Sequence, residues 1–334
     1  MKITIFEVEP WEREAFRTLE ENGYEVRYAE GPLELENAPE YADSEVISTF
    51  IYTSLSRELL AKFPNLQLVA TRSTGVDHID VEYCRDKGIK VANVPTYGEN
   101  TVAEHVFALL LAISHRLIQA VDRTRRGDFS PKGLQGFDLE GKTLGVIGTG
   151  NIGQHVIRIA NGFGMKVVAF DTRPDEALAR DLGFDYLDMP AVLSRADIVT
   201  LHVPGGKATR HLISSREFEQ MKDGTILINT SRGTVVDVRS LLHALAGGKV
   251  GAVGLDVLPE EPVIREEAEL LRAVFAKEHD LEALLADHIL LRLRNVGITP
   301  HSAFNTREAV QRILDTTCGN IDSFARGNPQ NLVD

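Results

Sequence analysis

A glycine-rich turn between a predicted strand and a predicted helix constrains this chain more than any other feature. The strand TLGVI (143–147) runs into GTGNIG, which places Gly148, Gly150 and Gly153 in G-x-G-x-x-G spacing where the helical segment QHVIRIANGF begins. Such glycines permit a tight turn and let the backbone approach a pyrophosphate, while the helix N-terminus supplies unpaired N–H groups. The turn predicts a βαβ unit that binds a dinucleotide.

A carboxylate after the glycine turn indicates which dinucleotide binds. The next predicted strand, KVVAF, is followed directly by Asp171. A carboxylate in this place accepts hydrogen bonds from the adenosine ribose hydroxyls and repels a 2'-phosphate. Arg173 lies nearby and weakens that repulsion. We therefore predict NAD, rather than NADP, as the cofactor.

Strand and helix patterns alternate along the whole chain, as in βαβ units with a parallel sheet. The second series of strands is apolar nearly throughout, which is typical of strands covered on both faces. We expect an α/β protein with two doubly wound parallel-sheet domains. The predicted strands are 2–8, 24–29, 45–51, 66–72 and 89–94, then 143–148, 166–170, 197–203, 225–229, 251–257 and 295–299.

Two long helical patterns stand outside these strands. One covers 101–126 and opens with Thr101 and Glu104 in capping-box spacing; the other covers 306–326 and opens at Thr306. We expect each to be one helix that connects domains. A charged stretch, 261–290, is predicted to be a helical insertion at the surface.

Composition excludes several classes of partner. The 49 Asp and Glu residues exceed the 36 Lys and Arg residues, and a net charge of -13 repels nucleic acid. Cys84 and Cys318 lack the close spacing of zinc or redox motifs, so we expect reduced thiols, a cytoplasmic location and no metal. The most apolar run, VFALLLAI, is too short to cross a membrane.

Three polar segments follow predicted strands: INTSRGTVVD (228–237), GLDVLPEEP (254–262) and TPHSAF (299–304). The carboxyl ends of parallel strands converge on the ligand crevice of a doubly wound sheet, so Arg232, Glu261 and His301 are expected to face one space.

The chemistry of these three residues is complementary for reduction of a 2-keto acid. Arg232 offers a planar fork for a carboxylate, and His301 can give a proton near neutral pH. Glu261, if hydrogen-bonded to His301, would favour the imidazolium and raise the pKa of His301. We predict these three residues as the catalytic group.

The chain resembles the D-isomer-specific 2-hydroxyacid dehydrogenase family over nearly its whole length. The motifs that carry the resemblance, in the order and spacing of the family, are RSTGVDHID (72–80), VPTYGENTVAEH (94–105), LGVIGTGNIG (144–153), DIVTLHVP (197–204), INTSRGTVVD, GLDVLPEEP and TPHSAF.

The resemblance assigns roles to individual residues and domains. It implies that 1–100 with 301–334 form a flavodoxin-like substrate domain and that 101–300 form a Rossmann NAD-binding domain. It implies that Arg232 binds the substrate carboxylate, that His301 is the acid/base and that Glu261 pairs with His301. The implied cofactor contacts are Gly148, Gly150, Asn151, Ile152, Gly153, Asp171, Val203, Pro204, Thr209, Thr230, Ser231 and Asp256, with Asp256 on the nicotinamide carboxamide; the implied substrate loop is Ser73, Thr74, Gly75 and Val76.

Two aromatic residues indicate the substrate. Tyr97 and Phe304 match positions near the substrate in the branch of the family that makes D-lactate, and an aromatic wall suits a methyl group. Gly98 and Glu99 depart from the Ser-Pro that is commoner in that branch. The resemblance to that branch implies an enzyme that interconverts pyruvate and D-lactate, and the resemblance to the family implies a homodimer.

Other functions remain open on the same scaffold. The keto acid could instead be glyoxylate, hydroxypyruvate or a relative of these, and a formate dehydrogenase would carry glutamine in place of Glu261. A phosphorylated substrate would need further cations on the substrate loop, where only Arg72 is evident. A different class is an NAD-sensing co-repressor on this fold, which the triad alone does not exclude.

Overall fold

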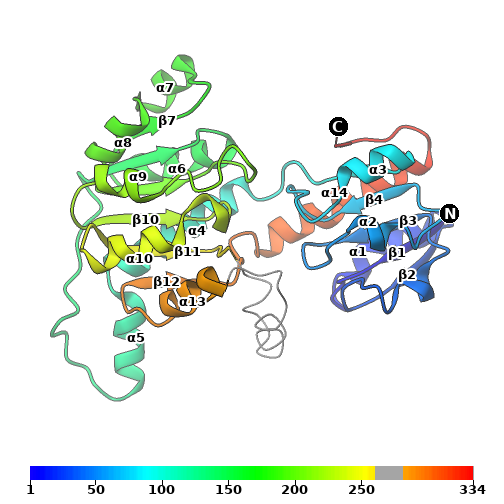
Figure 1. Cartoon of the computed structure of the whole chain (residues 1–334), viewed down its shortest axis with the longest axis horizontal. Helices are drawn as coiled ribbons and strands as arrows, with labels where there is room; N and C mark the ends of the chain where they lie inside the picture. Colours follow the sequence, from blue (N-terminus) through cyan, green and yellow to red (C-terminus); the bar gives the residue numbers. More distant parts are fainter. Residues whose placement is uncertain (260–280, 334) are drawn as a thin grey trace. The chain divides into compact units, whose positions relative to one another are not determined.

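The computed structural model describes residues 1–259 and 281–333. The chain forms two compact units, Met1–Gly98 with Asn305–Asp334, and Glu99–Phe304 (Figure 1). The divisions expected from the sequence, after residues 100 and 300, lie within a few residues of these limits. The assignment of substrate binding to the discontinuous unit stays a prediction.

The first unit is built on a five-stranded parallel sheet. Its strand order, β2-β1-β3-β4-β5, is that of flavodoxin-like folds, with the order reversing between β1 and β3. Strands β3 and β4 are buried along their whole length, because helices lie on both faces of the sheet. The strands are β1 (Lys2–Ile5), β2 (Glu25–Tyr28), β3 (Val46–Thr49), β4 (Leu68–Thr71) and β5 (Lys90–Ala92).

Side-chain caps fix where three of the helices in this unit begin. Ser56, Asp80 and Thr306 accept hydrogen bonds from the backbone N–H groups of Leu59, Tyr83 and Ala309, which would otherwise lack a partner. The helices are α1 (Arg13–Glu21), the short η1 (Ala38–Tyr41), α2 (Arg57–Leu60), α3 (Val81–Lys87) and α14 (Arg307–Ala325). The prediction that a helix opens at Thr306 is correct.

The second unit contains a seven-stranded parallel sheet in the order β12-β11-β10-β9-β6-β7-β8. From β6 to β11 this is the order of a Rossmann fold, and β12 adds a further parallel strand beside β11. The sequence predicted six of these strands and missed β8, which has two residues. The strands are β6 (Thr143–Ile147), β7 (Lys166–Phe170), β8 (Asp185–Tyr186), β9 (Ile198–Leu201), β10 (Thr225–Asn229), β11 (Val250–Leu255) and β12 (Val296–Ile298).

Helices cover both faces of this sheet, and each face has its own apolar core. Neighbouring residues of one strand enter opposite cores: Val146 packs with Val156 of α6, whereas Ile147 packs in the cluster that contains Leu241 of α10. Strands buried on both faces explain the nearly continuous apolar runs in the sequence. The helices are α4 (Glu99–Ser114), α5 (Leu117–Arg125), α6 (Asn151–Gly162), α7 (Glu176–Leu182), α8 (Met189–Arg195), α9 (Ser215–Gln220), the short η2 (Gly233–Val235), α10 (Val238–Ala246) and α13 (Leu281–Leu290).

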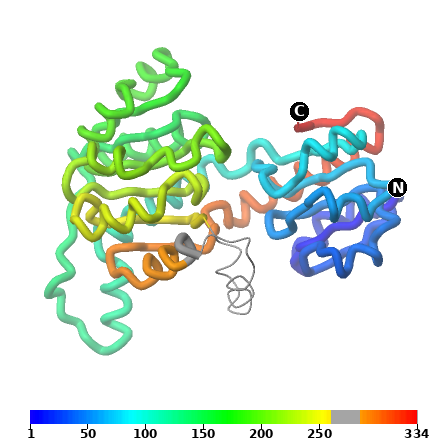
Figure 2. The backbone as a smooth tube through the Cα atoms, viewed as in Figure 1, coloured from blue at the N-terminus to red at the C-terminus, as the bar shows by residue number. Residues whose placement is uncertain are grey.

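The single helix predicted for 101–126 is wrong, because the chain bends by 62° between α4 and α5. Arg116 has a left-handed backbone with φ of 50°, and the carbonyl of Ser114 accepts a hydrogen bond from Phe137 instead of continuing the helix. The predicted capping box is wrong too, because α4 begins at Glu99 and Thr101 is buried inside it. Figure 2 shows α5 and the segment after it extending beyond the sheet.

Part of the predicted helical insertion is a helix. Of the predicted insertion 261–290, residues 281–290 form α13, and residues 261–280 lie outside the described residues. No single helix in the described ranges is long and apolar enough to cross a membrane; α4 and α5 meet that test only as a bent pair.

Candidate active site

The glycine turn joins β6 to α6 as the sequence predicts. Gly148 has φ of +96°, and a Cβ there would lie 2.6 Å from the carbonyl oxygen of His202. A Cβ on Gly153 would lie 2.2 Å from the carbonyl oxygen of Gly148, so only glycine lets the helix start this close to the strand. A Cβ on Gly150 would meet nothing within 4 Å, which leaves open space for a pyrophosphate at the helix N-terminus.

Asp171 is fixed beside this turn by hydrogen bonds from the protein. Its carboxylate accepts from the N–H of Thr149 at 2.8 Å, from the hydroxyl of Thr149 at 3.0 Å and from the N–H of Arg173 at 2.9 Å. The hydroxyl of Tyr186 lies 2.7 Å from that of Thr149. Burial raises the pKa of Asp171, but these hydrogen bonds outweigh it and hold the pKa below its ordinary value. The residue therefore presents an oriented, ionised carboxylate, which fits the ribose of NAD.

The ends of three neighbouring strands, β10, β11 and β12, are joined by hydrogen bonds. The side-chain amide of Asn229 donates to the carbonyl of Arg232 at 3.0 Å, and the N–H of Asp256 donates to the carbonyl of Asn229 at 2.9 Å. The N–H of His301 then donates to the carbonyl of Asp256 at 2.9 Å. The predicted residues Arg232, Asp256 and His301 therefore lie together at one edge of the sheet.

The side chain of Arg232 is half-buried and is directed by its neighbours. One guanidinium nitrogen, Nη1, donates to the carbonyl of Ser231 at 2.8 Å. The aliphatic part crosses Gly205, where a Cβ would lie 2.8 Å from Cγ of Arg232. Gly233, next in the chain, lies so close to Leu258 that a Cβ would be 2.1 Å from its carbonyl carbon. Both glycines are therefore needed for the arginine to occupy this position.

The loop that carries His301 is fastened to Asp256. The Asp256 carboxylate, which is 1% exposed, accepts hydrogen bonds from the N–H groups of Ser302 and Ala303, each at 2.9 Å, and from the hydroxyl of Thr299 at 2.5 Å. His301 itself has φ of 51°, a left-handed conformation that is costly for a residue with a Cβ. Such a conformation persists only where its surroundings over-determine it, and it is found at functional sites.

In the first unit, the predicted substrate loop follows β4. The hydroxyl of Ser73 donates to the carbonyl of Gly75 at 2.7 Å, and the hydroxyl of Thr74 donates to the carbonyl of Val94 at 2.7 Å. Within the described part of the chain, no residue accepts a hydrogen bond from the N–H groups of Thr74, Gly75 and Val76. Successive unpaired N–H groups are the donors of backbone anion sites.

Comparison with known proteins decides the family. The model of the D-isomer specific 2-hydroxyacid dehydrogenase NAD binding domain matches residues 107–303. A D-lactate dehydrogenase of Escherichia coli is 33% identical over 341 residues, with 100% of both chains covered. The chain belongs to the D-isomer-specific 2-hydroxyacid dehydrogenase family. It lies in the D-lactate dehydrogenase-like branch and is an NAD-dependent oxidoreductase.

Two further relatives of this dehydrogenase differ in their named activity. A glyoxylate reductase of Thermococcus litoralis is 36% identical over 298 residues, which cover 86% of this chain and 83% of that protein. The structure of a D-lactate dehydrogenase from Aquifex aeolicus in complex with NAD and lactic acid superposes with a TM-score of 0.85 at 35% identity and covers 99% and 98% of the two chains.

The remaining predicted cofactor contacts of the dehydrogenase lie at the same sheet edge. Asn151 and Ile152 form the first turn of α6. The hydroxyl of Thr209 donates to the carbonyl of Pro204 at 2.6 Å, and Ser231 donates to Asn229 through its N–H and its hydroxyl. The buried hydroxyl of Thr230 has no partner among the described residues, which leaves it available to a bound cofactor. Val203 and Pro204 follow β9, and Val203 lies beside Gly148 of the glycine turn.

Three other predicted site residues of the dehydrogenase are Glu261, Tyr97 and Phe304. Glu261, the predicted partner of His301, lies outside the described residues. Tyr97 belongs to the first unit, where its carbonyl accepts a hydrogen bond from Arg312 at 2.5 Å, and Phe304 ends the second unit. Both aromatic side chains are half-buried. Their contact with the substrate stays a prediction.

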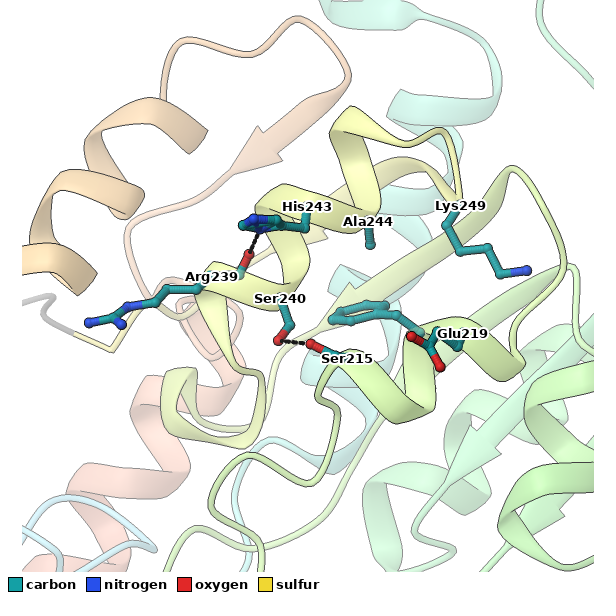
Figure 3. Close-up of a pocket in the computed structure, with 8 residues that line it drawn as sticks. Ser215, Glu219, Arg239, Ser240, His243, Ala244 and Lys249 are labelled. Atoms are coloured by element: carbon teal, nitrogen blue, oxygen red, sulfur yellow. Dashed lines mark hydrogen bonds between the residues drawn. The ribbon is translucent and has the colours of Figure 1, made fainter.

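One pocket of the dehydrogenase lies away from the predicted site residues. A pocket of about 590 Å³ between α9 and α10 is lined by none of the predicted site residues (Figure 3). Its cationic side chains Arg239 and Lys249 extend to opposite sides in Figure 3, so they do not converge on one ligand. In the described ranges, no group of three or more His, Cys, Asp or Glu side chains could hold a metal ion.

Arg72 and His105 of the dehydrogenase make contacts that the sequence does not indicate. Arg72, the cation named beside the substrate loop, is 2% exposed and donates to the carbonyls of Phe6 and Glu7 at 2.8 and 2.6 Å. His105 contacts Thr299, in the loop before His301. Both residues lie in sequence motifs, RSTGVDHID and VPTYGENTVAEH. Their hydrogen-bond partners are distant in the sequence, so the contacts cannot be predicted from it.

Proposed function

We propose that this dehydrogenase interconverts pyruvate and D-lactate, with NADH and NAD as the cofactor pair. The observation that carries the proposal is the hydrogen-bonded series from Arg232 through Asn229 and Asp256 to His301. It sets a cation suited to a carboxylate and a proton donor on adjacent strand ends, beside the glycine turn that fits NAD.

The chemistry assigns one task to each residue. The guanidinium of Arg232 binds the keto-acid carboxylate through its planar fork. NADH, which the glycine turn and Asp171 would hold, would supply the hydride for the new C–H bond at the carbonyl carbon. His301 donates its proton to the carbonyl oxygen as the carbon–oxygen π bond breaks, so the alcohol leaves neutral and His301 is left as imidazole. Glu261, in its predicted place beside His301, would favour the imidazolium and so keep the acid protonated.

The first unit supplies further support for a small, unphosphorylated acid. The unpaired N–H groups of Thr74, Gly75 and Val76 suit a carboxylate, and the fixed side chain of Ser73 holds their loop in shape. A phosphorylated substrate would need a cation on this loop, and the sequence offers Arg72. Its guanidinium is buried against the backbone and Ser48, so it is not available to a ligand.

Two aromatic side chains indicate which keto acid is reduced. Tyr97 and Phe304 favour a substrate with a small apolar group, as in pyruvate. A glyoxylate reductase among the relatives makes glyoxylate the second candidate, with hydroxypyruvate beside it.

A substrate screen with chiral analysis of the product tests the proposal. The purified protein with NADH is assayed on pyruvate, glyoxylate, hydroxypyruvate, phenylpyruvate and oxaloacetate. We expect the highest kcat/KM with pyruvate and D-lactate as its product. A higher kcat/KM for glyoxylate or hydroxypyruvate would replace pyruvate, and formation of L-lactate would overturn the proposal.

Measured turnover distinguishes the proposed enzyme from the alternative function, an NAD-sensing co-repressor. We expect His301→Ala, which removes the proton donor, to lower kcat by about 10² while NADH still binds. A wild-type protein that binds NADH tightly but reduces none of the five acids would favour the sensor.

We propose further that the enzyme is a cytoplasmic homodimer. Helix α5 has no buried residue and exposes Leu117, Ile118 and Val121, and Phe129 beyond it is 81% exposed. An apolar surface of this kind is typical of a protein interface. The thiols of Cys84 and Cys318 are both free, which suits a reducing compartment.

A further inference from the structure

His105 is a partly exposed polar residue of α4 with buried apolar neighbours in the sequence. Its neighbours Ala103, Val106 and Phe107 are buried in the core against the sheet. The His105 imidazole instead reaches the end of β12, where Nε2 lies 3.0 Å from the hydroxyl of Thr299 and 3.5 Å from Oδ1 of Asp256. The side chain of His105 is 21% exposed and that of Asp256 is 1% exposed.

The direction of these hydrogen bonds follows from counting protons. The hydroxyl of Thr299 lies 2.5 Å from Oδ1 of Asp256, and an ionised carboxylate can only accept, so Thr299 donates to Asp256. Having given its one proton, the hydroxyl of Thr299 can only accept from His105. Nε2 of His105 therefore carries a proton, and the three side chains form one directed chain from α4 to Asp256.

Asp256 in turn anchors the loop that carries His301. Its two carboxylate oxygens hold the N–H groups of Ser302 and Ala303, and its carbonyl holds that of His301. The left-handed backbone at His301 needs such restraint, since the conformation is unfavourable on its own. A misplacement of about 1 Å at a reacting group can cost about 10² in rate.

We propose that His105 is a positioning residue for the dehydrogenase reaction: through Thr299 and Asp256 it holds the loop that aims the His301 imidazole at the substrate oxygen. The inference rests on the proposed role of His301 as proton donor. It assigns to α4, which lies far from this loop in the sequence, a part in orienting the acid.

The first test compares His105→Leu with His105→Gln, because the glutamine amide can donate from about the position of Nε2. With pyruvate and NADH, we expect His105→Leu to lower kcat about 10-fold and to leave the dissociation constant of NADH within about two-fold. We expect His105→Gln to recover kcat to within about three-fold of wild type. The control is His243→Leu, a change of an exposed histidine on α10, which should leave kcat unchanged.

The second test measures hydrogen exchange and needs no turnover. In His105→Leu the amides of Ser302 and Ala303 should exchange at least about 10-fold faster than in wild type, with α6 unchanged. Unchanged exchange, a wild-type kcat in His105→Leu, or equal damage from glutamine and leucine would each overturn the proposal. If the wild type reduces no keto acid, the proposed function fails, and the exchange result still decides whether His105 anchors the loop.

Discussion

The carboxylate of Asp256 accepts the hydrogen bonds that hold the loop of His301, and so it maintains the left-handed φ of 51° at His301. The sequence suffices to predict that Arg232, His301 and Asp171 follow strands at one edge of the sheet, because the strands before them are legible along the chain. It does not predict that Asp256 anchors the loop, because that bond pattern depends on which backbone N–H groups meet the carboxylate in three dimensions.

Arg232→Lys tests the carboxylate-binding role. Lysine keeps the charge but loses the planar fork, so we expect KM for pyruvate to rise about 10-fold or more, with the NADH dissociation constant unchanged. Steady-state kinetics and NADH fluorescence titration measure the two quantities. Wild-type values of both KM and kcat would remove Arg232 from this role.

His202 predicts a pH dependence of stability. Burial lowers the pKa of His202 to about 3, whereas its pKa in the unfolded chain is about 6.5. The unfolded state therefore binds the proton first, and the free energy of unfolding falls as the pH decreases from about 6.5 towards 3, by up to about 1.4 kcal/mol per pH unit.

Urea unfolding between pH 7 and pH 5 measures this dependence. His202→Asn, which cannot take up the proton, should show a shallower slope against pH than wild type. His243→Asn on the exposed face of α10 is the control and should keep the wild-type slope. Equal slopes in all three proteins would contradict the assignment.

Among the elements, most strands and the glycine turn between β6 and α6 follow from apolar runs and turn residues, and the prediction of two doubly wound parallel sheets is confirmed. The two failures have physical causes. β8 has two residues, too few for a pattern, and the break between α4 and α5 is stabilised by Phe137, which is distant in sequence and donates to the carbonyl of Ser114.

Thr306→Ala tests the cap of α14. The Thr306 hydroxyl accepts from the N–H of Ala309, and its loss should lower the free energy of unfolding of the first unit by about 1 kcal/mol. Calorimetry of the variant beside Thr306→Ser measures the effect. Serine keeps the acceptor and should stay within a few tenths of a kcal/mol, so equal losses in both variants would exclude the cap as the cause.

At the scale of the whole molecule, each unit has an apolar core of its own, as a chain of 334 residues with two series of strands suggests. The surface for the proposed dimer cannot be predicted from the sequence, because the apolar residues of α5 follow the pattern of one long buried helix. The bend at Arg116 is what leaves Leu117, Ile118 and Val121 exposed.

Ile118→Glu combined with Val121→Glu tests the homodimer. A charge buried in the interface is unfavourable, so the mass measured by light scattering should fall from that of two chains to that of one. Leu35→Glu, at an exposed apolar residue of the first unit, is the control and should keep the wild-type mass. A wild-type protein that runs as a single chain would refute the dimer.

The order of the chain through its two units bears on biosynthesis. Residues 1–98 leave the ribosome first, yet α14, which packs against α1 and β4, is translated only after the whole of Glu99–Phe304. At synthesis rates of about 5–20 residues per second, roughly 200 residues take about 10–40 s. The amino-terminal segment therefore emerges earliest and completes its fold last, and during that interval its uncovered sheet is a natural client for chaperones.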